Sequence, residues 1–201
     1  MRNIFKKRLG MVALGLSLIG ALSGCGGKKS SDSKDPTAAL RNEVVTFVNE
    51  DLASISADRD AAVAAYNSYF DSGETNPKNF LTTLNNEAIP KMQTFVDNLS
   101  AIETKSTEVT ELKTLYLQGS QKQLDAMNKV ASAIAEENPD YLTEAEGYIN
   151  ESKSYFTQYE SQLKLISIDC NITINGSFSD DSEPVVEDPT ASDTETPAAT
   201  E

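Results

Sequence analysis

The stretch Asn138–Ile166 reads NPDYLTEAEGYINESKSYFTQYESQLKLI, and it decides the fold. It opens on Asn-Pro, which is typical of a helix start because asparagine caps free backbone N–H groups and proline suits the first turn. Apolar or small side chains then return every three or four residues, at Leu142, Ala145, Ile149, Ser152, Phe156, Tyr159, Leu163 and Ile166. A repeat of about 3.5 residues over this length predicts a helix that packs on a neighbour as in a left-handed coiled coil.

Three stretches upstream show the same helical spacing, and the joins between them are short. They are expected to start at Asp35-Pro36, at Asn76-Pro77 and near Ser106, and the first is expected to end near Ser72-Gly73. Their inward candidates are Leu40, Val44, Phe47, Val48, Leu52, Ile55, Ala62, Tyr66 and Tyr69, then Phe80, Leu81, Leu84, Ala88, Met92, Phe95, Leu99 and Ile102, then Val109, Leu112, Tyr116, Leu124, Met127, Ala131 and Ile134. We therefore expect an all-α fold, an antiparallel bundle of about four long helices within residues 36–176.

Two features interrupt the helical pattern. An internal proline removes one backbone hydrogen bond and clashes with the preceding turn, so Ile89-Pro90 predicts a kink or a short break. Such a kink is either a hinge without a role or one wall of a cleft. The run Gln118-Gly119-Ser120-Gln121 interrupts the stripe of the third helix. It predicts either a close helix crossing, which requires small residues, or a small polar cavity.

Composition and charge exclude several classes of function. The chain has 201 residues, with 17 Lys and Arg against 31 Asp and Glu, and it contains no His and no Trp. Without histidine, Ser-His and Cys-His nucleophile pairs and His-containing zinc and di-iron sites cannot form. The net charge of −14 would repel phosphate backbones, which excludes nucleic acid as a partner. We expect a protein that is not an enzyme and that holds no cofactor and no metal.

Two further patterns each have two interpretations. The loop Asp71–Asn76 offers oxygen ligands but lacks the residue order of a calcium loop, which favours a plain helix connection over a calcium site. Tyrosines on the last helix are spaced by seven, seven and four residues. This spacing is typical of the solvated edge of a core, and the alternative is a strip of rings that stacks on a ligand. These tyrosines are Tyr141, Tyr148, Tyr155 and Tyr159.

The first residues combine a basic stretch with a short apolar run. Met1–Gly10 carries four basic residues and no acidic one, and Met11–Leu22 is an apolar run of twelve residues. This run is too short to cross a bilayer as a helix, and it has the length of the apolar core of a signal peptide. The run ends in Leu22-Ser23-Gly24-Cys25, which resembles the lipobox of bacterial lipoproteins.

The lipobox resemblance implies a cut between Gly24 and Cys25 and a diacylglyceryl group on the Cys25 thiol. Two acyl chains, of the palmitate type, hold a protein on a membrane stably. The mature protein would then lie on the extracytoplasmic face of the cell membrane, anchored by lipid and not crossing it. The expected domains are a signal peptide (1–24), a flexible tether (25–35), the helical-bundle domain (36–176) and a disordered acidic tail (177–201).

The lipid would leave Cys170 as an unpaired cysteine. An odd cysteine in an exported protein is either a buried thiol or a reactive or dimer-forming one. The segment that follows, Asn171–Gly176, alternates polar and apolar residues, so we expect a short extended segment that lies on the bundle.

As a whole, the chain resembles the small helical lipoproteins of Gram-positive bacteria, which have no assigned activity. We expect an interaction or scaffold module at the cell envelope, with an unknown envelope protein or polymer as its partner. The alternative is a small-ligand-binding lipoprotein that serves a transporter or sensor, with Gly119–Gln121, Ser152 and Pro90 as hints of a pocket. An enzyme would require a convergent pair of acids, which the spacing of the acidic residues does not show.

Overall fold

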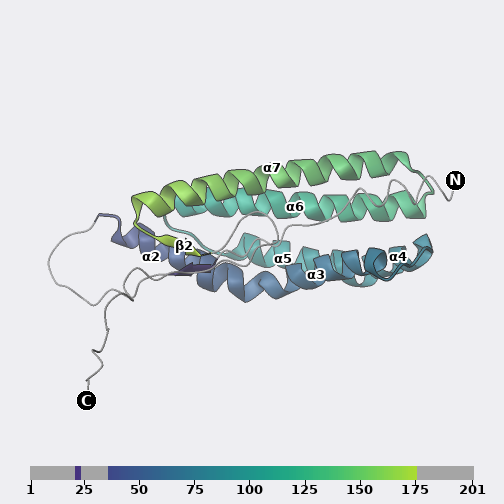
Figure 1. Ribbon diagram of the computed structural model, residues 1–201, viewed down its shortest axis with the longest axis horizontal. Coiled ribbons are helices and arrows are strands. Elements are labelled where there is room, and N and C mark those ends of the chain that lie inside the picture. The colour runs from purple at the N-terminus through teal and green to yellow at the C-terminus, as the bar shows by residue number, and fades with distance from the viewer. Residues whose placement is uncertain (1–20, 24–35, 176–201) are drawn as a thin grey trace, which may run out of the picture.

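The computed structural model describes residues 21–23 and 36–175, in which four long helices form one antiparallel bundle (Figure 1). The first long helix consists of α2 (Ala38–Thr46), η1 (Phe47–Leu52) and α3 (Ala53–Asp71), and the second of α4 (Pro77–Thr83), η2 (Leu84–Ala88) and α5 (Ile89–Ala101). The third is α6 (Thr107–Ala135) and the fourth is α7 (Asp140–Asp169). The predicted all-α bundle is therefore confirmed.

Polar side chains cap two of the helix starts that the sequence predicts. The side-chain oxygen of Asn76 accepts from the backbone N–H of Lys78 at 3.1 Å, directly before Pro77. The Ser106 hydroxyl accepts from the backbone N–H of Val109 at 3.3 Å. Both residues have extended backbone, as N-caps require, so the chain turns into each helix where its sequence supplies the acceptor.

The core is formed by the stripes of apolar residues that the sequence predicts. All eight stripe residues of α7, from Leu142 to Ile166, are buried, and so is every inward candidate of α6. These two helices make the most extensive contact in the bundle. This contact fits the coiled-coil repeat from which it was predicted.

The irregularity predicted at Ile89-Pro90 takes the form of a π-helical turn. The turn, η2, lies directly before Ile89, and α5 then continues through Pro90 to Ala101. A π turn widens the helix and shifts its hydrogen-bond pattern by one residue, so a residue that lacks an N–H is accommodated without a break. A second π-helical stretch, η1, interrupts the first long helix, and no feature of the sequence predicts it.

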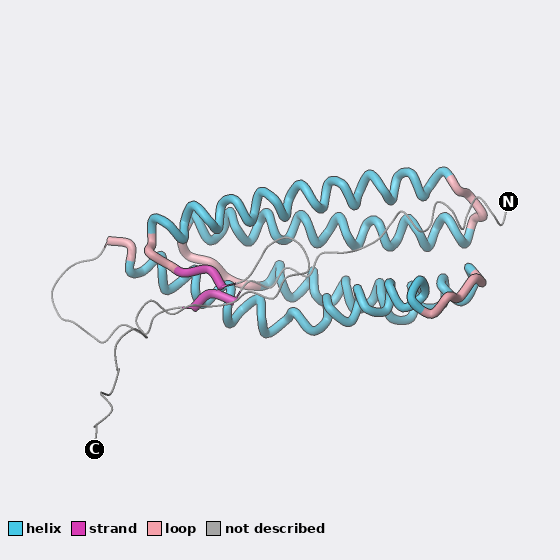
Figure 2. Tube along the Cα trace, viewed as in Figure 1, coloured by secondary structure: helices cyan, strands magenta, loops and turns pink. Residues whose placement is uncertain are grey.

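A short antiparallel strand pair lies at one end of the bundle (Figure 2). The strands are β1 (Ala21–Ser23) and β2 (Thr173–Asn175). Ile172 and Ile174 are partly buried and pack on the core, so the extended segment predicted here is confirmed. Cleavage between Gly24 and Cys25, as the sequence predicts, would remove β1 from the mature chain.

Three helix ends meet where the first long helix begins: the start of α2, the start of α6 and the end of α7. We call this part of the bundle the entry end. Arg41 on α2 donates from Nε to the carbonyl oxygen of Cys170 at 2.6 Å. The Glu43 carboxylate accepts from the backbone N–H of Ser106 at 3.1 Å and also from that of Lys105. Partial burial alone would raise the pKa of Glu43, but these N–H donors outweigh it and hold this pKa below its ordinary value. Glu43 therefore remains an anion at the positive end of α6.

Candidate functional site

An arginine lies inside the bundle, at a position that is not among the predicted core or site residues. Arg59 on α3 is only 2% exposed, its Nε donates to the side-chain oxygen of Gln123 on α6 at 3.3 Å, and its guanidinium lies 5.4 Å from the ring centroid of Phe156 on α7. One side chain thus links three helices. Its spacing could have revealed it, because Arg59 continues the helical stripe between Ile55 and Ala62.

Next to this arginine, α6 and α7 cross closely. A Cβ added at Gly119 would lie 2.9 Å from the Cε1 atom of Phe156, inside normal contact distance. The Ser152 hydroxyl donates to the Gly119 carbonyl oxygen at 2.8 Å, and the Ser120 hydroxyl donates to a carbonyl oxygen one turn earlier in α6. The geometry favours the close crossing over the small polar cavity, because Phe156 fills the space and both hydroxyls are bonded to backbone.

Two buried tyrosines complete this layer of the interior. Tyr116 packs edge-on against Phe156 and Tyr159, with ring centroids 5.3 Å and 5.0 Å away. Burial raises the pKa of Tyr159 far above its ordinary value. Burial also raises the pKa of Tyr116, an effect that Arg59 partly offsets and Asp60 increases. Both phenols are therefore neutral at physiological pH and cannot act as bases there.

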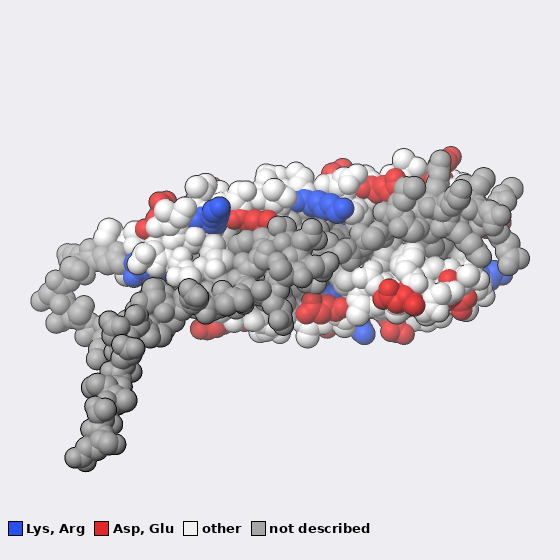
Figure 3. Space-filling model, viewed as in Figure 1, with Lys and Arg blue, Asp and Glu red and all other residues white. Residues whose placement is uncertain are grey.

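Lysines of α6 cover the outer tyrosines of α7. Lys122 and Lys129 each bond a glutamate of α7 and lie over a tyrosine ring. The partners are Glu151 (2.6 Å) and Tyr148 (5.0 Å to the ring centroid) for Lys122, and Glu144 (2.9 Å) and Tyr141 (4.5 Å) for Lys129. This favours the solvated edge of a core over a ligand-stacking strip, because the protein's own lysines occupy the ring faces. Basic side chains are likewise scattered among acidic ones over the face that Figure 3 shows.

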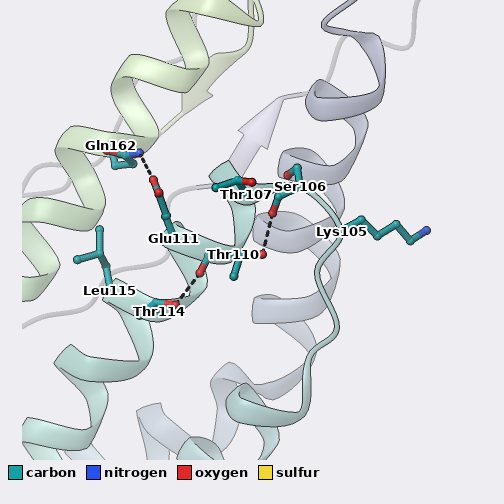
Figure 4. A pocket seen from close by; sticks show the side chains of 8 residues that line it. All are labelled: Lys105, Ser106, Thr107, Thr110, Glu111, Thr114, Leu115 and Gln162. Carbon is teal, nitrogen blue, oxygen red and sulfur yellow. Dashed lines mark hydrogen bonds between the residues drawn. The ribbon is translucent and has the colours of Figure 1, made fainter.

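A groove of about 470 Å³ opens at the entry end, between the start of α6 and the C-terminal third of α7 (Figure 4). Its lining consists of Lys105, Ser106, Thr107, Thr110, Glu111, Thr114, Leu115 and Gln162. The Thr110 and Thr114 hydroxyls donate to carbonyl oxygens one turn earlier, and Gln162 donates to Glu111 at 3.1 Å. Lys105 points away from the other lining side chains in Figure 4. The groove is open to solvent, a shape that suits the surface of a partner better than it suits enclosure of a small molecule.

The structure favours the simpler interpretation of both the loop Asp71–Asn76 and Cys170. The Glu74 carboxylate accepts from the backbone N–H groups of Thr75 and Asn76 and from the Asn79 side chain at 2.7 Å, which favours a plain helix connection over a calcium site. Cys170 is fully buried at the end of α7, which favours the buried-thiol interpretation. Within residues 21–23 and 36–175, no group of three or more acidic or cysteine side chains is placed to hold a metal ion.

The predicted cleavage and lipidation positions, Gly24 and Cys25, lie outside the described residues, as do the rest of the tether and the tail 177–201. No helix in the described part of the chain is long and apolar enough to cross a membrane. No protein-family model, curated protein or solved structure matches the chain. The groove at the entry end is therefore the candidate functional surface, on its geometry alone.

Proposed function

We propose that the protein is a lipid-anchored envelope protein that works outside the cell membrane as an interaction module. The anchor is supported by three adjoining features: the basic Met1–Gly10, the apolar run Met11–Leu22, and the lipobox-like tetrad that ends at Cys25. The predicted tether of residues 25–35 would join this anchor to the entry end of the bundle.

The groove at the entry end is the observation that supports docking. The interior beside Gly119 is filled by the Phe156 ring and leaves no space for a ligand there, whereas the groove lies on the outer surface. The groove presents hydroxyl, amide and charged groups around Leu115. Such a surface suits a partner that itself offers hydrogen-bonding groups, either an envelope protein or a surface polymer.

The alternative, a small-ligand-binding lipoprotein for a transporter or sensor, draws support from the size of the groove. A volume of about 470 Å³ is within the range of ligand pockets. However, ligand pockets enclose most of the ligand, and this groove is open to solvent. Its polar side chains also bond to one another and to backbone, so they are not converged on a bound solute. These features favour the interaction module.

The Cys25→Ser variant tests the anchor. We expect it to leave the membrane fraction or to accumulate as an uncut precursor, because serine lacks the thiol that receives the lipid. Cell fractionation, combined with the mass of the purified chain, measures both outcomes. A processed, membrane-bound protein that carries serine at this position would contradict the anchor.

A photo-cross-linking residue at Thr114 tests docking at the groove on intact cells. We expect a cross-linked product that weakens when Thr110 is also replaced with arginine, because the longer charged side chain would occupy the groove. Thr157 is the matched control, since it is exposed on α7 and its hydroxyl also donates to a carbonyl oxygen one turn earlier, outside the groove lining. Equal products from Thr114 and Thr157, or none from Thr114, would exclude docking at this groove.

A further inference from the structure

Two large apolar side chains remain exposed among the described residues. Leu165 is 61% exposed and Ile168 is 68% exposed. They stand three residues apart on α7, so they share one face of the helix. The opposite face, with Leu163 and Ile166, is buried in the core. The pair is thus turned away from the bundle and contributes nothing to its core.

Leu165 and Ile168 lie at the entry end of the bundle. Leu165 and Ile168 belong to the last turns of α7, which end at the entry end, where Arg41 bonds the Cys170 carbonyl oxygen. Figure 1 shows the C-terminal end of α7 beside α2, the first helix of the bundle. The pair therefore lies at the end of the bundle that the predicted tether joins.

The predicted tether is short enough that it would hold this end of the bundle close to the lipid. If residues 25–35 form the flexible tether that the sequence predicts, their root-mean-square reach is about 17–20 Å. The 30 residues of α7 span about 45 Å, so the opposite end of the bundle, near Asp140, would stand well away from the membrane. A lipid surface is consequently the apolar partner nearest to Leu165 and Ile168.

We propose that Leu165 and Ile168 contact the surface of the membrane that carries the anchor. This inference rests on the lipid anchor of the proposed function. Two side chains are too few to hold an acidic protein on a membrane, and of the two flanking charges, Lys164 favours anionic headgroups whereas Asp169 opposes them. The anchor compensates for this weak affinity, because it raises the effective concentration of this face at the lipid surface and so increases the fraction of molecules in contact with it.

The absence of tryptophan from the chain permits a direct test. The Ile168→Trp variant of residues 25–201 is coupled through the Cys25 thiol to a maleimide lipid in phosphatidylcholine and phosphatidylglycerol vesicles. Cys170 is fully buried, so the coupling is selective for Cys25. We expect tryptophan emission to shift to shorter wavelength and to be quenched at least about twofold by brominated lipid. Leu165→Trp is expected to behave in the same way.

Thr143→Trp is the matched control, because Thr143 is exposed on the same helix near its other end. Its emission is expected to be unaffected by brominated lipid. Absence of quenching at Ile168 and Leu165 in folded, coupled protein would overturn the proposal, and so would equal quenching at Thr143. Tryptophan emission that is already at short wavelength without vesicles would also overturn the proposal, because a second copy of the chain would then cover the pair. Coupling is chemical, so these outcomes are independent of whether cells lipidate Cys25.

Discussion

Replacing Gly119 with valine is expected to lower the free energy of unfolding by about 2–3 kcal/mol. The new Cβ would lie 2.9 Å from the Cε1 atom and 3.0 Å from the Cζ atom of Phe156. This ring cannot move aside easily, because it is fully buried and packs against Tyr116. The better helix propensity of valine offsets only a few tenths of a kcal/mol. Urea unfolding followed by far-ultraviolet circular dichroism measures the loss.

Gly147 provides the matched control for this substitution. It lies on α7, it is exposed, and an added Cβ there would meet nothing within 4 Å. Gly147→Val is therefore expected to change the free energy of unfolding by less than about 0.5 kcal/mol. Gly119→Val combined with Phe156→Leu should lower the free energy of unfolding by less than the sum of the two single substitutions, because leucine leaves space for the new side chain. Equal effects at Gly119 and Gly147 would mean that the space beside Gly119 is open.

The helical stripes could be predicted from the sequence, but the surroundings of Gly119 could not. The stripes on α6 and α7 could be predicted because helical periodicity is local, and every predicted position on these two helices is buried. The run of small residues around Gly119 could not be assigned to a crossing or to a cavity. That choice depends on which side chain of another helix faces it, and Phe156 is brought there by the fold.

Arg59 was missed for a different reason. It stands between Asp58 and Asp60, so the sequence around it resembles a solvated, charged surface. Burial of a charge is costly unless the protein supplies polar partners, and Gln123 becomes such a partner only when α3 and α6 pack together. The groove is equally non-local, because Glu111 and Gln162 meet across two helices. The lipobox resemblance, in contrast, is complete within a few adjoining residues.

Raising the pH above about 10 is expected to unfold the bundle in one cooperative step. Burial raises the pKa of Tyr66, Tyr116 and Tyr159 above the ordinary tyrosine value of 10.0, with Arg59 partly offsetting the effect at Tyr116. The folded state thus retains phenolic protons that the unfolded chain releases. The resulting stability is present below pH 10 and is lost as the pH rises above it. Above pH 10, ionisation of three such groups in the unfolded chain lowers the free energy of unfolding by about 4 kcal/mol per pH unit. The total free energy of unfolding of a domain is about 5–15 kcal/mol.

An alkaline titration that follows phenolate absorbance and helical circular dichroism together measures this effect. The chain has no tryptophan, so its near-ultraviolet absorbance reports mainly the tyrosines. Part of the phenolate signal should appear in the same step as the loss of helix, because Tyr116 and Tyr159 ionise only when the bundle opens. Tyr159→Phe removes one of the three groups and should move the midpoint to higher pH. Complete phenolate formation in a bundle that keeps its helices would show that these hydroxyls reach solvent without unfolding, in contradiction to their burial.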